Sequence, residues 1–315
     1  MMHHRALTAW VLVRVVGGLH CCTMSATTSG RRAALRSGTA AALGAASAWR
    51  ARSAVGVPAA PGFDYFSECA VVPRALVINS VDVAATAAFF GKALGVEGST
   101  PTADGRGVRL AFGPTALSRP ADFYPGISTF EVDGGHFALE IRPAAEAATL
   151  SERVAYVQLT LPTIRASKIL DFGGEVVDAY GVWDIVAPGS VPLRLLVGDE
   201  RRDRVMYVAY KVANVKKAEA FYAAYGFARA PYPRARPPTT EESPFDPNPP
   251  KGAVYLQSCE DAVGVLLVPD KKRKKPPAAP DAFGPLKLKA TPALAGTAVD
   301  PDGNALELLA GDVVA

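Results

Sequence analysis

Residues 75–95 read ALVINSVDVAATAAFFGKALG, and residues 207–226 repeat the same pattern as YVAYKVANVKKAEAFYAAYG. Each copy opens with a short apolar run rich in β-branched or aromatic residues, Ala75–Ser80 in the first and Tyr207–Val212 in the second. Apolar residues spaced three or four positions apart follow in both copies. This spacing predicts a strand followed by an amphipathic helix, so we expect a chain built from repeated strand–helix units.

The limits of both helices are marked by residues that cap helices. Asp82 and Asn214 stand between strand and helix, where their side chains can accept hydrogen bonds from backbone N–H groups of the first turn. Gly95 and Gly226 follow the last apolar residues, and glycine commonly ends a helix by taking the left-handed conformation. We therefore expect each helix to lie between these two caps.

The apolar stripe of each helix also predicts which aromatic side chain is buried. Phe90 and Tyr222 fall on the stripe, whereas Phe89 falls beside it. We expect Phe90 and Tyr222 to anchor the core and Phe89 to contribute less.

Two weaker copies complete the pattern. Residues 156–178, YVQLTLPTIRASKILDFGGEVVD, predict a strand, Thr163 as helix cap, a short helix and a further strand. A last unit is reduced to two strand-forming stretches, Leu286–Ala290 and Thr297–Leu309, with no helix between them. In chain order, units one to four thus begin near residues 75, 156, 207 and 286. The other expected strands are Val108–Phe112, Phe137–Ile141, Glu175–Asp178, Leu193–Val197, Ala253–Gln257 and Val263–Val268.

The first 63 residues differ from the rest of the chain. They contain seven arginines but no lysine and no acidic residue, which is typical of a targeting leader that is cleaved. Within them, Arg31 and Arg32 precede a mild apolar run that ends in an A-x-A motif at Ala46–Ala48, which resembles a twin-arginine signal for the thylakoid lumen. We expect a plastid protein of the thylakoid lumen or stroma, with the mitochondrion as the alternative.

Without this leader the chain is acidic. Residues 64–315 contain 27 of the 34 Lys and Arg residues and all 30 Asp and Glu residues, which gives them a net charge of −3. Nucleic acid is disfavoured as a partner because its phosphates require a positive surface. No membrane span is expected, since the apolar stretch of the leader is too short. Hydrolase, NTPase and dinucleotide-binding classes have no support, because their motifs do not occur.

Histidine and cysteine are scarce after the leader. His136, Cys69 and Cys259 are the only ones, too few for a zinc ribbon, a His triad or a framework of several disulfides. We expect Cys69 and Cys259 to be two buried thiols, with a single disulfide as the less favoured alternative.

The most specific motif is DPDGNALE at residues 300–307, a tight turn before an apolar strand that carries one carboxylate. Together with the four units it resembles the vicinal oxygen chelate superfamily, and the number of units resembles tandem glyoxalase I. The resemblance covers about residues 70–312 and implies an α+β fold in which repeated βαβββ units form curved mixed sheets. After the leader at 1–63, it implies glyoxalase-like domains at 64–200 and 201–315, the second with a reduced last unit.

The resemblance further implies where a metal would lie. Family enzymes hold a divalent metal inside the curved sheet through a His or Gln on the first strand of a unit, seven residues before the helix cap, and a Glu on the last strand. This count leads to Ala75, Tyr156 and Tyr207, none of which can replace an imidazole. The last-strand positions are Glu140, Arg194, Leu266 and Glu307. Glu140 and Glu307 therefore remain as the two candidate metal ligands.

The pairing of the units decides whether these two carboxylates meet. If unit one pairs with unit four, as the resemblance implies, Glu140 and Glu307 face one cup and His136 lies near the start of the Glu140 strand. The other cup is then lined by Tyr156, Arg194, Tyr207 and Leu266. That cup cannot chelate a metal, because arginine brings a fixed positive charge and leucine has no lone pair. No catalytic residue is identified.

These observations predict a glyoxalase-like protein with a degenerate metal site, acting as a small-molecule-binding or assembly module without a cofactor. Loss of the ligands favours a protein without enzymatic activity. One alternative is a lactoylglutathione lyase or related isomerase that uses Glu140 and Glu307 with a divalent metal. The other is an extrinsic subunit of a photosynthetic membrane complex with a thylakoid partner. The sequence identifies neither ligand nor partner.

Overall fold

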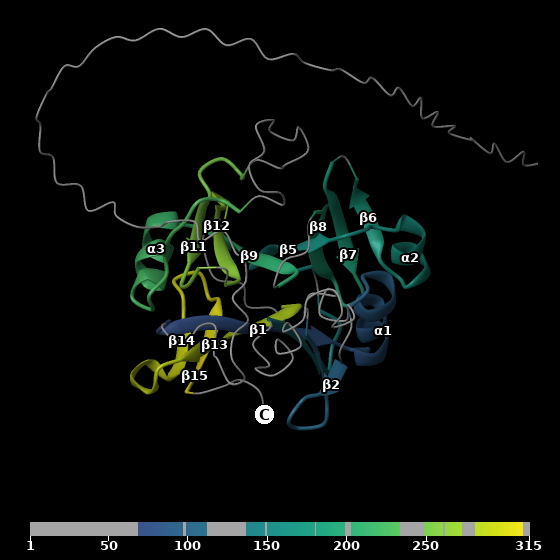
Figure 1. Cartoon of the computed structure of the whole chain (residues 1–315), viewed down its shortest axis with the longest axis horizontal. Coiled ribbons are helices and arrows are strands. Elements are labelled where there is room, and N and C mark those ends of the chain that lie inside the picture. Colours follow the sequence, from purple (N-terminus) through teal and green to yellow (C-terminus); the bar gives the residue numbers. More distant parts are fainter. Residues whose placement is uncertain are drawn as a thin grey trace, which may run out of the picture. The chain divides into compact units, whose positions relative to one another are not determined.

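Two mixed β-sheets dominate the part of the chain that the computed structural model describes (Figure 1). The expected leader and His136 lie outside this part. The described residues are 69–96, 99–111, 137–148, 150–179, 181–198, 203–233, 249–260, 262–272 and 281–310.

The first sheet joins unit one to unit four. Its strands lie in the order β14, β15, β13, β1, β4, β3, β2. Strand β1 lies between β13, to which it is antiparallel, and β4, to which it is parallel. The strands are β1 (Val71–Ser80), β2 (Ser99–Pro101), β3 (Val108–Ala111), β4 (Ala138–Pro143), β13 (Phe283–Ala290), β14 (Gly296–Val299) and β15 (Ala305–Ala310).

The second sheet joins unit two to unit three. Its strands lie in the order β10, β11, β12, β9, β5, β8, β7, β6. They are β5 (Val154–Leu161), β6 (Glu175–Asp178), β7 (Trp183–Ala187), β8 (Val191–Val197), β9 (Val205–Val212), β10 (Ala228–Arg229), β11 (Val254–Gln257) and β12 (Gly264–Pro269). The sheets thus pair unit one with unit four and unit two with unit three, which is the arrangement that the resemblance implies. Each sheet takes strands from both sides of residue 200.

Two of the helices begin where the sequence places their caps. Asp82 caps α1 (Val83–Ala88) and Asn214 caps α3 (Val215–Ala223). Each side chain accepts a hydrogen bond from the backbone N–H group three residues further on, at 2.8 Å for Asp82 and 3.1 Å for Asn214. Figure 1 shows α1 near α2 at one end of the sheets and α3 at the other.

The third helix corrects the sequence prediction. α2 (Ala166–Asp171) begins after Arg165 without a side-chain cap, so Thr163 is not its cap. The extended segment before the helix allows Ile164 to pack against the core, which a helix starting at Thr163 would have redirected. After the other two helices, Gly95 and Gly226 have φ values of 68° and 86°, as expected for helix-ending glycines.

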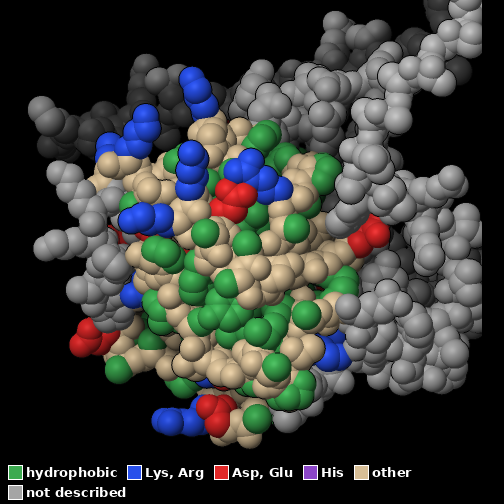
Figure 2. All heavy atoms as spheres, turned by 90° about the vertical axis from the view of Figure 1, so that its left-hand side faces the viewer, with side chains coloured by type: hydrophobic (Ala, Val, Ile, Leu, Met, Phe, Trp, Pro, Cys, Tyr) green, Lys and Arg blue, Asp and Glu red, His purple; other side chains and the backbone are tan. Residues whose placement is uncertain are grey.

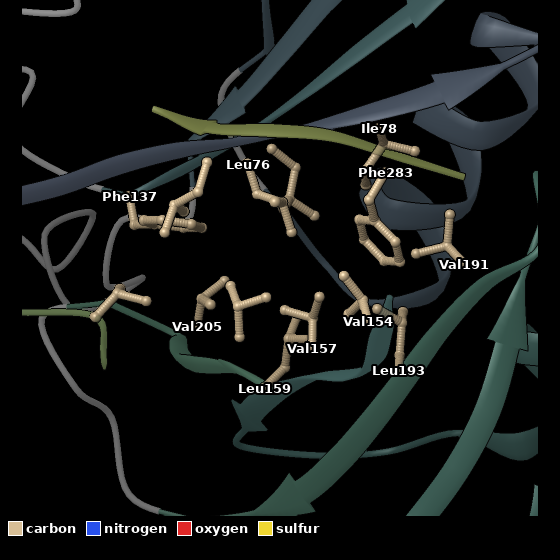
Figure 3. Close-up of a cluster of buried hydrophobic side chains, with 14 of the residues drawn as sticks. Leu76, Ile78, Phe137, Val154, Val157, Leu159, Val191, Leu193, Val205 and Phe283 are labelled. Carbon is tan, nitrogen blue, oxygen red and sulfur yellow. The ribbon is translucent and has the colours of Figure 1, made fainter. Parts of the chain in front are cut away.

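The hydrophobic core lies between the two sheets (Figure 3). Leu76 and Ile78 of β1 and Phe283 of β13 face Val157 and Leu159 of β5. Successive side chains of a strand point to opposite faces, so the residues between these core positions point outward. Burial of each large apolar side chain contributes about 1.5–3 kcal/mol to stability.

The expectation that Phe89 lies off the core is wrong. Phe89 and Phe90 are both fully buried, and their rings meet edge to face with centroids 5.7 Å apart. After α1 the chain continues as a π-helix, η1 (Phe89–Ala93). The wider turn of a π-helix shifts the register of the helix, which brings both rings to the core. In the regular helix α3, Tyr222 is buried as expected, and Phe221 is partly exposed.

The DPDGN turn joins β14 to β15 and is hydrogen-bonded to α3 and to the segment before it. Asp300 accepts hydrogen bonds from the backbone N–H groups of Asp302 and Asn304, at 2.9 and 2.8 Å. The Tyr222 hydroxyl of α3 donates to Asp300 at 3.5 Å, and the Ala213 N–H donates to Asp302 at 2.8 Å. Burial raises the pKa of Asp300. The turn is therefore a buried hydrogen-bonded unit as well as a hairpin connection.

Cys69 and Cys259 form a disulfide, so the expectation of two free thiols is wrong. The residues are 190 positions apart in sequence, but their Cα atoms lie 6.0 Å apart. Cys69 precedes β1 of the first sheet, and Cys259 lies between β11 and β12 of the second. The bond therefore ties the two sheets together. The folding of the chain alone brings these cysteines into reach.

Figure 2 shows the side of the molecule that carries α3. Hydrophobic side chains are spread over the middle of this face, and Lys and Arg side chains gather near its upper edge. No helix in the described part of the chain is long and apolar enough to cross a membrane.

Candidate functional site

Glu140 lies on the face of the first sheet that points away from the core. In β1, Leu76 faces the core, so its neighbours Ala75 and Val77 face outward. Val77 is the register partner of Glu140 on β4, and Ala75 is the register partner of Lys287 on β13. Glu140 and Lys287 therefore share the outward face.

Three cationic side chains surround Glu140. Lys287 Nζ lies 2.7 Å from Glu140 Oε2, and an Arg142 guanidinium nitrogen lies 3.1 Å from the same oxygen. Arg109, directly opposite Glu140 on β3, lies 3.8 Å from Oε1. The Glu140 and Lys287 side chains are only 5% and 10% exposed. We call these four residues the Glu140 cluster.

The donor groups of the Glu140 cluster do not fit a divalent metal. Ala75 and Lys287 are register partners on the first strands of units one and four, where the resemblance places metal ligands. Ala75 has no lone pair to donate, and the ammonium of Lys287 repels a cation. No group of three or more His, Cys, Asp and Glu side chains that could hold a metal occurs among the described residues.

Glu307 lies on the same outward face of the first sheet as Glu140. It is the register partner of Lys287, on β15. Strands β13 and β1 separate β15 from β4, so the backbones of the two glutamates lie roughly 14 Å apart at the usual strand spacing. The structure therefore brings both predicted carboxylates to one side of one sheet, with Lys287 between them. The predicted helper His136 lies outside the described residues.

Four tyrosines lie together on the outward face of the second sheet. The ring centroids of Tyr156 and Tyr207, both predicted from the sequence, lie 6.1 Å apart. Tyr232 and Tyr255 lie 5.7 and 5.9 Å from Tyr207. Leu266 packs in the same cluster. The structure thus brings together the predicted residues and two tyrosines that sequence analysis missed.

Of the two missed tyrosines, only Tyr255 could have been found from the sequence. Tyr255 is the register partner of Leu266, so the alternation of the predicted strand could have placed it on this face. Tyr232 lies in a proline-rich stretch after β10, and no periodic pattern marks it.

Arg194 joins this cluster as half of an ion pair. Its Nε and one terminal guanidinium nitrogen donate to the two carboxylate oxygens of Asp184 at 2.6 and 2.7 Å. Its guanidinium carbon lies 4.1 Å from the centroid of the Tyr156 ring. Burial opposes the charged form of Arg194, but the hydrogen bonds and charge of Asp184, together with the Tyr156 and Tyr207 phenols, raise the pKa of the guanidinium. We call Tyr156, Arg194, Tyr207, Tyr232 and Tyr255 the tyrosine–arginine cluster.

The phenol hydroxyls of this cluster differ in their hydrogen bonding. The Tyr207 hydroxyl lies 2.6 Å from that of Tyr232 and donates to Gln158 Oε1 at 3.3 Å. Burial raises the pKa of Tyr207, and it raises the pKa of Tyr232 to about 12, so both phenols are neutral near pH 7. The Tyr156 hydroxyl is buried, and it makes no hydrogen bond of acceptable geometry within the described part of the chain.

The fold is similar to that of a known enzyme. No family model matches the sequence, and no curated protein is similar to it. Glyoxalase I from Zea mays has 13% sequence identity and a TM-score of 0.53, with 78% of this chain and 94% of that chain covered. Two single-residue variants of the maize enzyme give TM-scores of 0.52 at 12% and 13% identity, covering 78% and 76% of this chain and 95% and 92% of theirs. The expected α+β glyoxalase-type fold is confirmed.

Proposed function

We propose that this protein is a glyoxalase-like small-molecule-binding protein in which an internal ion pair replaces the metal site. The observation that carries the proposal is the 2.7 Å contact between Lys287 Nζ and Glu140 Oε2. A protonated amine thus lies beside the carboxylate that the family resemblance assigns to the metal.

The electrostatics of the Glu140 cluster support this proposal. A divalent ion that took Glu140 from Lys287 would leave a buried ammonium without its partner, at a cost of several kcal/mol. Arg109 and Arg142 add further positive charge on the same carboxylate. Because tight metal sites need several converging donors, we expect Glu140 to bind divalent metals weakly.

The same geometry disfavours a metal-dependent lactoylglutathione lyase. Glu140 is already engaged by three cations, and Glu307 lies on a strand three positions away across the sheet. A general base must lie within hydrogen-bond reach of the proton that it removes. The partners of Glu140 within the protein would therefore have to be displaced before it could hold a metal or accept a substrate proton.

Metal analysis and native mass spectrometry of protein purified without chelator test the proposal. We expect well under one Zn, Ni or Co per chain, and no glyoxalase I activity above background after Zn²⁺ or Ni²⁺ is added. The matched variants Glu140→Gln and Glu307→Gln should have the same metal content as the wild type. Stoichiometric metal that is lost in either variant would overturn the proposal.

We also propose that the protein acts in the thylakoid lumen. The arginine-rich leader with Arg31 and Arg32 supports this location, and the disulfide between Cys69 and Cys259 supports an oxidising compartment. Plastid fractionation and N-terminal sequencing of the mature protein test it. We expect the mature chain to begin between about Ala48 and Asp64. A mature chain that keeps Arg31 and Arg32 would contradict the twin-arginine interpretation.

A further inference from the structure

One buried hydroxyl of the tyrosine–arginine cluster lacks a well-formed hydrogen bond. Tyr156 is only 8% exposed, and its hydroxyl, although close to the Tyr207 and Tyr232 phenols, makes no hydrogen bond of acceptable geometry with the described residues. Leaving a buried hydroxyl unbonded costs about 1–3 kcal/mol, so such groups are normally satisfied by protein, water or a bound molecule. The Tyr156 hydroxyl therefore offers a hydrogen-bond donor to something outside the described chain.

The charges of this cluster cancel. Arg194 and Asp184 form a bidentate pair, so neither charge is left over for an ionic ligand. The Tyr207 and Tyr232 phenols also stay neutral near pH 7. An anionic ligand would have to compete with Asp184 for Arg194. A cationic ligand would be repelled by the guanidinium of Arg194. The electrostatics favour an uncharged ligand.

The remaining surface of the cluster is aromatic. The rings of Tyr207 and Tyr255 lie 5.9 Å apart and those of Tyr207 and Tyr156 lie 6.1 Å apart, in both cases edge to face. Leu266 and Ala209 pack among them. Tyrosine rings combine a large apolar contact area with little flexibility, which suits the recognition of flat, rigid molecules.

We propose that the tyrosine–arginine cluster binds an uncharged planar molecule that accepts a hydrogen bond from the Tyr156 hydroxyl through a carbonyl or ether oxygen. This inference rests on the proposed function, since it names the site and ligand class of the proposed binding activity. It places that activity on the second sheet, away from the Glu140 cluster.

The probe for the test is 7-methoxycoumarin, a neutral planar lactone, titrated into the full-length protein and followed by calorimetry. We expect saturable binding of one molecule per chain, weakened about five- to tenfold in Tyr156→Phe by the loss of one hydrogen bond. The matched control Tyr225→Phe, whose ring packs against Phe221 of α3, should bind as the wild type does. The anionic analogue 7-methoxycoumarin-4-acetate should bind at least about tenfold more weakly than the neutral probe.

A second measurement shows whether the Tyr156 hydroxyl is free in the absence of ligand. Tyr156→Phe should unfold at the same denaturant concentration as the wild type or at a higher one, because no well-formed native hydrogen bond is lost. Absence of coumarin binding, equal binding by Tyr156→Phe, or preference for the acetate would overturn this inference, as would a destabilised Tyr156→Phe. Those results leave the proposed metal-independent function standing, which the metal content of the wild type decides separately.

Discussion

Lys287 on β13 and Glu140 on β4 form an ion pair across β1, the strand that lies between them, with Nζ 2.7 Å from Oε2. The residues of β1 that face the same side are Ala75 and Val77. Because Ala75 carries only a methyl group, the long lysine side chain can extend over β1. The side chain of Lys287 therefore extends over Ala75, the position at which the resemblance expects an imidazole.

Glu140→Gln should lower the free energy of unfolding by about 3–5 kcal/mol, because it leaves Lys287 and two arginines without their shared carboxylate. Lys287→Met should cost less, since Glu140 keeps Arg109 and Arg142. Urea unfolding of both variants measures the difference. Lys217→Met on the exposed side of α3 is the control and should change stability by less than about 0.5 kcal/mol. Equal losses for the two cluster variants would show that Glu140 is not the centre of the cluster.

Phe89→Ala and Phe90→Ala should each cost about 3–5 kcal/mol, because both rings are fully buried and each truncation leaves a cavity. Phe221→Ala, at a partly exposed position of α3, should cost less. Denaturant unfolding gives the order. If Phe89→Ala were as mild as Phe221→Ala, the π-helical segment would not hold Phe89 in the core in solution.

Removal of the disulfide in the double variant Cys69→Ser, Cys259→Ser should lower the free energy of unfolding by about 3–5 kcal/mol, since the bond closes a long loop of the unfolded chain. Thermal or denaturant unfolding under non-reducing conditions measures this loss. A reducing agent should destabilise the wild type by a similar amount and leave the double variant unchanged. A reducing agent that destabilises both proteins equally would assign its effect to something other than this bond.

Stability should fall as the pH rises from 10 towards 12, in part through Tyr232. Burial raises its pKa in the folded protein from 10.0 to about 12. The unfolded chain therefore loses this proton first, and the fold loses stability through the interval between the two pKa values. Tyr232→Phe should show a smaller decrease when unfolding is measured at pH 9, 10 and 11. An identical decrease in both proteins would mean that Tyr232 titrates normally in the folded state.

The sequence alone determined the repeated units and the features that depend on short spacing. Asp82 and Asn214 cap their helices because a cap acts on backbone groups only three residues away. The same holds for the DPDGN turn, whose hydrogen bonds close within five residues. The grouping of Tyr156 with Tyr207 was conditional on the unit pairing that the resemblance implies, and the pairing of β5 with β9 then places both on one face.

Other features were decided by the tertiary structure, because they join residues that are distant in sequence. Lys287 reaches Glu140 only where β1 brings β13 and β4 close, and Cys69 meets Cys259 only where the two sheets stack. Phe89 enters the core through a π-helical turn, a change of helix type that the apolar spacing does not encode. Local hydrogen bonds and periodicity are written into neighbouring residues, whereas the charge environment of a site depends on packing of the whole chain.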